Sequence, residues 1–411
     1  MSRLLEPVGV TTRHSASLFP WQAGSTLPTA GPVLGLNVLA GNTVFHYDPW
    51  ECYASGIITS PNMVVLGQLG KGKSALVKTH LNRQLLAGRQ AYILDPKGEY
   101  APLAAARGLA HLRLAPGSPD RLNPLEAHPD DTPAQTGRRR TSTVTALAAT
   151  GLGRDLTAEE RAAISTAVHD LPAAAVLPDV VHRLLDPTPV MAQTLRTTPD
   201  ALAAAIRPAA LELRRLLSGD LAGIVDGPST TRLDPDGPGL VLDLSAAFGT
   251  AALPAVMVCA GAWLSHVLQR PNGRQRLLLV DEAWALLGLP ATTAWLQGLS
   301  KLARAHGVQL ITVVHRVSDL AGQADAGTAT RAQAQGLLTD AETRVIYTQA
   351  PAERALLRDL LGLTDVETEL VTQLPAHRAL WLIGGRAAVV DHVLTSDESG
   401  LLVDTDSRMR S

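Results

Sequence analysis

The segment "VVLGQLGKGKSALVKTH", Val64 to His80, restricts the fold of this chain more than any other stretch. It joins an apolar run, the pattern GxxxxGKS and a helix-like run. Such a loop turns sharply and directs backbone N–H groups at phosphate oxygens, and side chains at Gly67 and Gly72 would obstruct that approach. The segment therefore predicts a strand, a phosphate-binding loop and a helix. The residues that we expect to bind a nucleotide are Gly67, Gln68, Leu69, Gly70, Lys71, Gly72, Lys73, Ser74 and Ala75.

Two side chains of this loop carry the chemistry. We expect the Lys73 ammonium to reach the β- and γ-phosphates of ATP and the Ser74 hydroxyl to bind Mg²⁺. A glycine-rich turn with a chance lysine is the alternative interpretation. It is disfavoured because the other half of a hydrolytic site is present further along the chain.

That other half is the run "RLLLVDEAW", in which four apolar residues end in Asp281 and Glu282. Carboxylates at the end of a parallel strand lie at the carboxyl edge of the sheet, where a phosphate loop also lies. Asp281 is suited to hold the Mg²⁺ hydration shell, and Glu282 is suited to be the base that positions the attacking water. An ordinary acidic strand end is the alternative. The acid pair favours hydrolysis of the nucleotide. It argues against a kinase, which transfers the phosphate to a bound acceptor.

Three further residues are candidates for contacts with the γ-phosphate. His315 follows the strand-like "VQLITVV" and would sense that phosphate, although a structural histidine fits nearly as well. Arg304 lies in "LSKLARAHG" and would reach a neighbouring subunit's nucleotide as an arginine finger. Arg344 is the second choice for this role, and a solvated arginine is the alternative for both. Lys97, in "DPKGEY", is expected at the same carboxyl edge as Lys73.

The apolar pattern predicts an α/β fold with a central, mostly parallel sheet. Strand candidates are continuously apolar, which suits a sheet covered on both faces. They are Met63–Leu66, Ala91–Asp95, Leu240–Leu244, Leu277–Asp281, Val308–Val314, Arg344–Thr348 and Ala379–Ile383. Strand signals vanish between Leu125 and Thr231, where the pattern is helical. We therefore expect a β-rich lead-in at 1–60, a nucleotide-binding domain at 61–125 and 231–395, an inserted all-α subdomain at 126–230 and a tail at 396–411.

The composition limits the partners and the cellular compartment that this chain is expected to have. The 411 residues carry a formal charge of −2, so any DNA-binding surface must be local. Cys52 and Cys259 form neither a disulfide framework nor a metal-ligand pattern, which fits a reducing cytosol. The apolar run Ala251 to Leu268 contains a proline and a histidine, and we interpret it as a buried helix rather than a membrane span. The basic stretch "GRRRTS", 137–142, is expected in a loop, either solvated or contacting DNA or a partner.

The motifs "ILDPKGEY" (93–100), "LNPLE" (122–126) and "LLLVDEAWALL" (277–287) together resemble the HerA/FtsK superfamily. Within it, the chain is most similar to the conjugative type IV secretion ATPases of the VirB/TraC/TrbE kind, over about residues 30–405. The resemblance implies a RecA-like motor domain with an all-α subdomain, a hexamer at the membrane, and ATP as the substrate whose hydrolysis drives the motor. Two features depart from the family. His315 replaces the usual Thr-Gln, and only about 60 residues precede the phosphate loop, where the family carries a large docking domain.

Three functions are consistent with these observations. The favoured one is an ATP-driven motor of a conjugation or secretion apparatus, without a membrane span of its own. It would act in the cytoplasm at the inner face of the membrane, with membrane-embedded components and DNA as candidate partners. The alternative is a soluble DNA translocase of the HerA/FtsK kind. A nucleotide-gated assembly component without turnover is the third, and Glu282 argues against it because such a protein needs no base.

Overall fold

The computed structural model describes residues 27, 29–127, 131–169, 171–231, 234, 236–268, 273–286, 290–318, 336, 338 and 340–400. Within these parts of the chain, one sheet of 11 strands has the order β2-β1-β11-β10-β9-β3-β8-β7-β4-β6-β5. The strands are β1 (Val33–Asn37), β2 (Thr43–His46), β3 (Met63–Leu66), β4 (Gln90–Asp95), β5 (Ala110–Arg113), β6 (Gly239–Asp243), β7 (Arg276–Val280), β8 (Val308–Val314), β9 (Thr343–Ile346), β10 (Arg378–Ile383) and β11 (Arg386–His392).

The sheet is parallel from β9 through β3, β8, β7, β4 and β6 to β5. The remaining strands β10, β11, β1 and β2 are joined to it by antiparallel pairing. Strands β3, β4, β7 and β8 are buried along their whole length, as expected for apolar parallel strands covered on both faces. The predicted α/β fold with a mostly parallel sheet is therefore confirmed.

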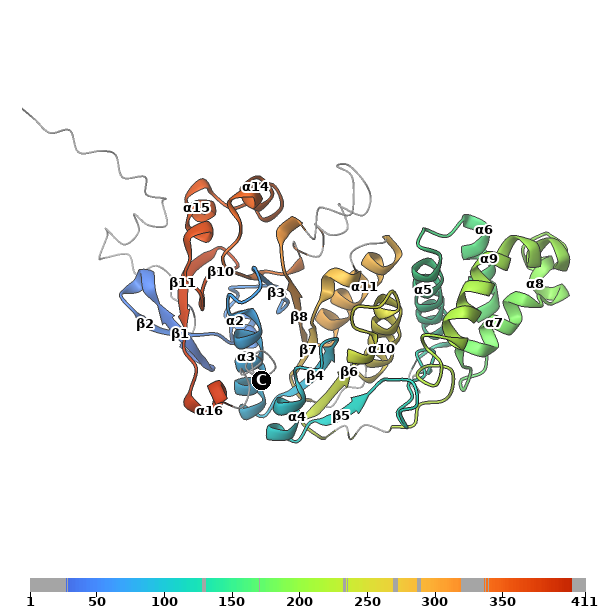
Figure 1. Cartoon of the computed structure of the whole chain (residues 1–411), viewed down its shortest axis with the longest axis horizontal. Coiled ribbons are helices and arrows are strands. Elements are labelled where there is room, and N and C mark those ends of the chain that lie inside the picture. The colour runs from blue at the N-terminus through green and yellow to red at the C-terminus, as the bar shows by residue number, and fades with distance from the viewer. Residues whose placement is uncertain are drawn as a thin grey trace, which may run out of the picture.

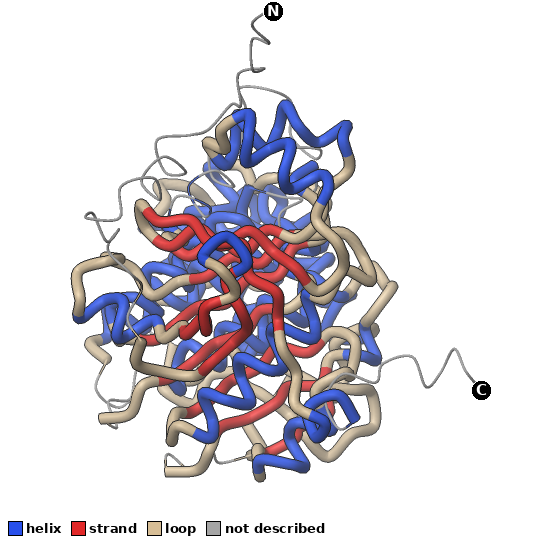
Figure 2. Tube along the Cα trace, turned by 90° about the vertical axis from the view of Figure 1, so that its left-hand side faces the viewer, coloured by secondary structure: helices blue, strands red, loops and turns tan. Residues whose placement is uncertain are grey.

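Helices lie on both faces of this sheet, as Figure 2 shows by the blue segments on either side of the red strands. Successive strand side chains point to opposite faces, so Val65 belongs to the same core cluster as residues of α3, while Val64 belongs to the cluster that includes residues of α10 and α11. The helices are α2 (Pro49–Ala54), α3 (Lys73–Leu86), α4 (Ala101–Arg107), α5 (Pro133–Leu152), α6 (Ala158–Val168), α7 (Leu177–Leu185), α8 (Pro189–Thr194), α9 (Pro199–Ser218), α10 (Leu253–Leu268), α11 (Pro290–Ala305), α14 (Arg354–Leu361), α15 (Asp365–Gln373) and α16 (Ser396–Glu398).

Helix α10 occupies the apolar run that was predicted to be a buried helix, and that prediction is confirmed. Its side chains Val256, Met257 and Val258 have no exposed surface, because they lie between the sheet and the neighbouring helices. Among the helices that the structure describes, none combines the length and the apolar character needed to cross a bilayer.

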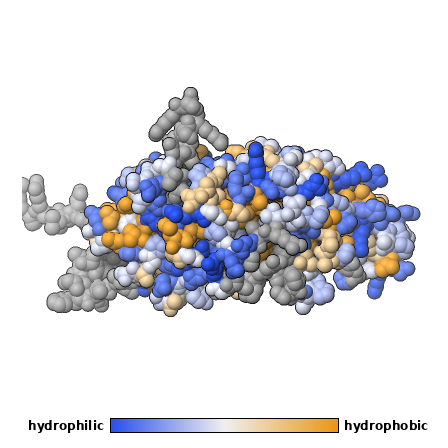
Figure 3. Space-filling model, turned by 90° about the horizontal axis from the view of Figure 1, so that it is seen from below, coloured by the Kyte–Doolittle hydropathy of each residue, from blue (hydrophilic) through white to orange (hydrophobic). Residues whose placement is uncertain are grey.

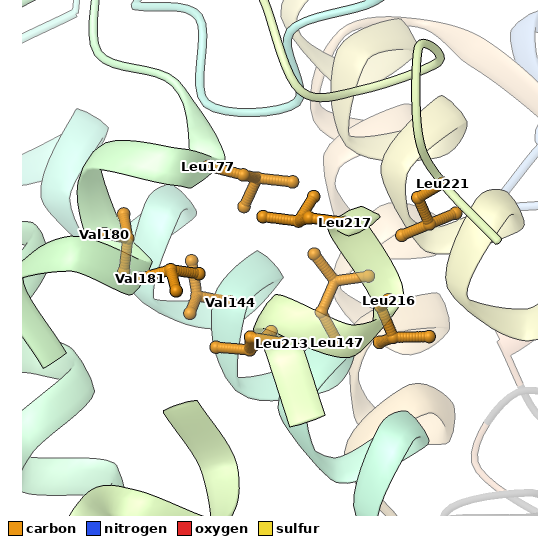
Figure 4. Close-up of a pocket in the computed structure, with 9 residues that line it drawn as sticks. All are labelled: Val144, Leu147, Leu177, Val180, Val181, Leu213, Leu216, Leu217 and Leu221. Atoms are coloured by element: carbon orange, nitrogen blue, oxygen red, sulfur yellow. The ribbon is translucent and has the colours of Figure 1, made fainter. Parts of the chain in front are cut away.

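Helices α5–α9 form one end of the molecule, on the right in Figure 1. Helix α5 packs against α10 and α11, and the apolar core runs without a break from the sheet into this end. The inner faces of α5, α7 and α9 meet around a small, purely aliphatic cavity (Figure 4), which offers no polar group to a ligand. All eleven strands of the described sheet lie outside the interval 126–230. The division of the chain into domains stays a prediction.

The opposite end of the sheet is built from the β-rich lead-in. Strands β1 and β2 pair onto β11, so they extend the central sheet, and β2 is its outermost strand. Val33, Leu39 and Val44 are exposed there. Figure 3 shows apolar side chains gathered toward the same end of the molecule. This end therefore presents apolar side chains and a strand edge to the surface.

The prediction that "GRRRTS" lies in a loop is wrong, because these residues belong to α5. This helix begins with a capping box between Thr132 and Gln135, which sequence inspection overlooked. Arg140 then falls on the buried face of the helix, 2% exposed. Its guanidinium donates hydrogen bonds of 2.8–3.1 Å to the carbonyl oxygens of Leu125, Leu171, Pro172 and Ala173. Arg140 is thus a structural residue that ties α5 to two loops.

Replacing Arg140 by methionine should lower the free energy of unfolding by about 2–4 kcal/mol, because buried carbonyl groups lose a charged donor. The matched control is Arg138→Met, which changes an exposed arginine of the same helix and should cost less than about 0.5 kcal/mol. Urea unfolding followed by circular dichroism measures both. Equal effects of the two substitutions would contradict the structural role of Arg140.

Candidate functional site

The carboxyl ends of strands β3, β8, β7 and β4 lie along one edge of the sheet. Leu66 at the end of β3 pairs with Val314, and Val280 at the end of β7 pairs with Thr312 of β8 and Leu94 of β4. The segments that follow these four strands therefore start at the same edge of the sheet. They contain the phosphate loop after β3, His315 after β8, the pair Asp281–Glu282 after β7 and the turn after β4. In open parallel sheets, ligands bind at this edge, where loops from neighbouring strands meet.

The loop after β3 has the geometry of a phosphate cradle. It runs to Gly72, which precedes helix α3 with a φ of 109°. Lys73 is the first residue of α3, is 5% exposed, and donates hydrogen bonds from Nζ to the carbonyl oxygens of Gly67 and Gln68 (2.9 Å to Gln68). Leu69, Gly70 and Ser74 are exposed. A positive helix terminus and a lysine thus face an accessible loop, as anion binding requires.

Two glycines of the loop are required by residues that come from the far end of the chain. A Cβ atom at Gly67 would lie 2.4 Å from Cβ of Tyr347, and one at Gly72 would lie 3.1 Å from Nδ1 of His377. The N–H of His377 also donates to the carbonyl oxygen of Lys71 (2.9 Å). The sequence analysis missed Tyr347 and His377 because neither belongs to a recognisable motif.

Asp281 and Glu282 follow β7 and are both buried, with 6% and 3% exposure. The backbone N–H of Glu282 donates to Oδ1 of Asp281 (2.9 Å), and the Tyr100 hydroxyl donates to Oδ2 (3.2 Å). Burial, followed by the neighbouring charge of Glu282, raises the pKa of Asp281 to about 6. Glu282 has a φ of 53°, in the left-handed region that non-glycine residues occupy at a cost and often at functional sites.

The Glu282 carboxylate lies between two nitrogen-bearing side chains. Nε2 of His315 lies 2.8 Å from Oε2, and Nζ of Lys97 forms an ion pair with Oε1. Burial alone would lower the pKa of Lys97, but the hydrogen bond and charge of Glu282 raise it overall. The structure thus brings the predicted base and the predicted sensor into contact. Lys97 lies at this edge of the sheet as expected, and the structure adds Tyr100 of the same "DPKGEY" motif; sequence reasoning gave neither residue a partner.

The oxygen donors at this edge fit Mg²⁺ bound together with a nucleotide. Mg²⁺ commonly uses one or two protein oxygens, substrate phosphates and water, rather than an all-protein cage. Within the described residues, no group of three or more histidine, cysteine, aspartate or glutamate side chains forms such a cage. The Ser74 hydroxyl and the Asp281 carboxylate are the predicted ligands. The raised pKa of Asp281 reflects two adjacent buried acids whose charge a divalent cation would stabilise.

The two arginine candidates lie away from this edge within their own chain. Helix α11, which contains Arg304, ends at Ala305 just before β8 begins, so it ends near the opposite edge of the sheet from His315. The side chain of Arg304 lies outside the described residues. Arg344 pairs with Val64 at the start of β9, and its guanidinium donates to the carbonyl oxygens of Ala341 (3.2 Å) and Leu361 (3.0 Å).

A pocket lies beside the phosphate loop, with about 840 Å³ of empty space that includes open solvent. One wall is the face of α3, and the other is formed by the chain around β9, β10 and β11. The Thr79 hydroxyl is buried on this face and has no hydrogen-bond partner within the described residues. The lining includes Gly72, Ala75, Leu76, Thr79, Tyr347, His377, Asp391 and His392. The pocket thus continues from the loop toward polar side chains.

No protein-family model matches the chain, and no curated protein matches it in sequence. Solved structures do match. VirB4 of Thermoanaerobacter pseudethanolicus has a TM-score of 0.73 at 20% identity, over 92% of this chain and 100% of that chain. The bacterial conjugative coupling protein TrwB has a TM-score of 0.59 at 16% identity, over 82% and 85%. TrwB in complex with ADP and Mg²⁺ matches over the same shares, with a TM-score of 0.58 at 16% identity.

These similarities establish the fold. The chain has the α/β RecA-like P-loop fold that VirB4 and TrwB share, and the predicted resemblance to conjugative ATPases is confirmed at this level. At identities of 16–20% the fold is what the comparisons show, and the roles of individual residues stay predictions.

Proposed function

We propose that this protein is a Mg²⁺-dependent ATPase that acts as a motor of a conjugation or type IV secretion apparatus. One observation carries the ATPase part of the proposal. Three adjacent parallel strands end at one edge of the sheet. Their ends are followed by the phosphate loop, by His315 and by the buried pair Asp281–Glu282. This arrangement unites phosphate binding, metal binding and a base for water.

The residues divide the work of hydrolysis between them. The loop N–H groups and Lys73 bind the phosphates, with Ser74 and Asp281 as metal ligands. Bound Mg²⁺ supplies positive charge that neutralises the phosphate oxygens. Glu282 orients the attacking water and accepts its proton, and His315 responds to the γ-phosphate through its contact with Glu282. Lys73 must leave the carbonyl groups of Gly67 and Gln68 to meet a phosphate.

The pocket beside the loop is suited to the nucleoside part of ATP. It begins at Gly72 and continues along α3, so a nucleotide with its phosphates in the loop would extend its sugar and base along this wall. The Thr79 hydroxyl, which has no hydrogen-bond partner in the part of the chain that the structure describes, supplies a polar group there together with the side chains of His377 and Asp391. TrwB, which is similar to this chain in fold, was solved in complex with ADP and Mg²⁺, which supports nucleotide binding by this chain.

The setting of the motor is also part of the proposal. The similarity to VirB4 and to a conjugative coupling protein supports work in conjugation or secretion. We infer a ring of six copies at the cytoplasmic face of the membrane, in contact with membrane-embedded components of the apparatus. The second candidate is a DNA translocase of the HerA/FtsK kind, which the likeness to the coupling protein TrwB favours.

One experiment tests both candidates. ATP hydrolysis is measured against protein concentration with no DNA, single-stranded DNA and double-stranded DNA, with and without EDTA. Hydrolysis that EDTA abolishes and that DNA leaves unchanged is expected for the secretion motor. Strong stimulation by DNA would favour the translocase. No hydrolysis at any concentration would contradict the proposal that this protein is an ATPase.

A further inference from the structure

The turn after β4, residues 95–100, is held in a fixed shape. The Asp95 carboxylate accepts hydrogen bonds from the backbone N–H groups of Lys97 (3.2 Å), Glu99 (3.1 Å) and Tyr100 (2.9 Å). Gly98 has a φ of 69° and lies so close to Ser245 that a Cβ atom would be 3.3 Å from its side chain. The directions in which the side chains of this turn leave the backbone are therefore set by its own hydrogen bonds and by the segment that follows β6.

Side chains of this turn contact both acids of the site. Lys97 forms an ion pair with Glu282, and Tyr100 donates to Asp281. Glu99 meets Lys78 of α3 at 3.5 Å, which links the turn to the helix that follows the phosphate loop. The turn after β4 thus connects helix α3 to the two acids that follow β7.

Charge explains why a lysine lies at this position. The Glu282 side chain is 3% exposed and directly follows a second buried carboxylate, so its ionised form is costly without a nearby cation. The Lys97 side chain is 24% exposed, so the lysine keeps contact with solvent while its ammonium reaches the acid. The ammonium also lies 5.7 Å from the centre of the Phe248 ring, which restricts its position further.

We propose that Lys97 is a positioning residue that holds the carboxylate of Glu282 in place for its work on water, rather than a ligand of the nucleotide phosphates. The inference rests on the proposed ATPase function. Without Lys97, the Glu282 side chain loses an anchor and leaves its position toward solvent. A displacement of about 1 Å in a catalytic group is enough to slow a reaction by roughly 10²-fold.

The first test needs no nucleotide. Thermal unfolding is measured for the wild type, Lys97→Met, Glu282→Gln and the double variant. Lys97→Met should lower the unfolding midpoint by roughly 3–6 °C, because it leaves a buried carboxylate without its partner. The same substitution in the Glu282→Gln background should have little effect, because a neutral amide needs no counter-charge. Lys301→Met, at an exposed lysine of α11, is the matched control and should leave the midpoint unchanged.

The second test measures ATP binding and turnover separately. Lys97→Met should reduce kcat by roughly 10–100-fold and keep the Kd for ATP close to that of the wild type. Lys97→Arg keeps a cation of similar reach and should restore most of the lost turnover. The Lys301→Met control should hydrolyse ATP at the wild-type rate.

Each outcome decides the proposal. An equal loss of thermal stability in the Glu282 and Glu282→Gln backgrounds would show that Lys97 does not act on this carboxylate. A loss of ATP affinity as large as that of Lys73→Ala would make Lys97 a phosphate ligand and overturn the proposal. A wild-type protein without hydrolysis would refute the proposed ATPase, and with it the role of Lys97 in turnover. The nucleotide-free unfolding measurements would still report whether the ion pair exists.

Discussion

Replacing Glu282 by glutamine should reduce ATP turnover by roughly 10²–10⁴-fold and leave ATP bound to the protein. Glutamine has nearly the shape of glutamate but cannot accept the proton of the attacking water. The side chain also remains within reach of His315 and Lys97, so the loop and the metal ligands keep their places. Turnover is measured by phosphate release, and retention by the amount of ATP that stays with the protein after gel filtration.

Lys73→Ala is the contrasting substitution. Its ammonium is the cation that we expect nearest to the β- and γ-phosphates, and a hydrogen bond to a charged group contributes about 1.5–3 kcal/mol. The Kd for ATP should therefore rise roughly 10–100-fold. Titration with a fluorescent ATP analogue measures it. If both substitutions weakened ATP binding equally, the division of roles between Lys73 and Glu282 would be wrong.

The sequence predicted the centre of the site because its chemistry fixes residue types over short spacings. A phosphate loop needs glycines and a lysine within eight residues, and hydrolysis needs acids directly after an apolar strand. The structure has strands β3 and β8 at the predicted bounds, with β7 ending at Val280 just before Asp281. These features follow from the local residue pattern alone, so they could be predicted from a single sequence.

Contacts between distant segments were outside the reach of that reasoning. Gly67 needs its missing side chain because Tyr347 lies against it, and the partner of Asp281 is the hydroxyl of Tyr100. Neither pair is separated by a characteristic spacing that would identify it from the sequence. Both partners are tyrosines in a chain that has only five, and Tyr100 ends the motif "DPKGEY". The available signals were the scarcity of tyrosine and, for Tyr100 alone, a place in a motif.

Two strands and one helix show where local pattern fails. Strand β5 is at the sheet edge and has only one buried residue among its four positions, so it lacks the continuous apolar run of its neighbours. Strand β11 ends in Asp391 and His392, which obscured it. The arginine run in α5 suggested a surface loop, whereas carbonyl groups of distant loops surround Arg140. In each of these three segments, contacts with distant parts of the chain determine the structure, and the local residue pattern does not show them.

Activity should depend on self-association, because Lys73, Mg²⁺ and Glu282 are assigned to the ground-state phosphates and the water, and none of these three supplies the extra positive charge for the leaving γ-phosphoryl group. An arginine from a neighbouring subunit commonly supplies it and is worth roughly 10³–10⁵ in rate. Arg304 remains our first choice. Its helix ends near the sheet edge opposite the phosphate loop, so Arg304 would serve a neighbour's site rather than its own. Arg344 is less suited, because its guanidinium is bound to two carbonyl groups of its own chain.

Arg304→Ala should therefore bind ATP and associate normally, but hydrolyse ATP roughly 10³-fold or more slowly than the wild type. Lys301→Ala, at an exposed position one turn earlier on α11, is the matched control.

Mixing Arg304→Ala with Glu282→Gln should restore part of the activity. Each variant alone lacks one half of every site, whereas a mixed ring contains interfaces at which an intact Glu282 meets an intact Arg304. Wild-type specific activity should also rise with protein concentration, since a monomer holds only one half. Turnover by a monomer, or no recovery in mixed rings whose formation is shown by light scattering, would refute the role of an arginine in trans.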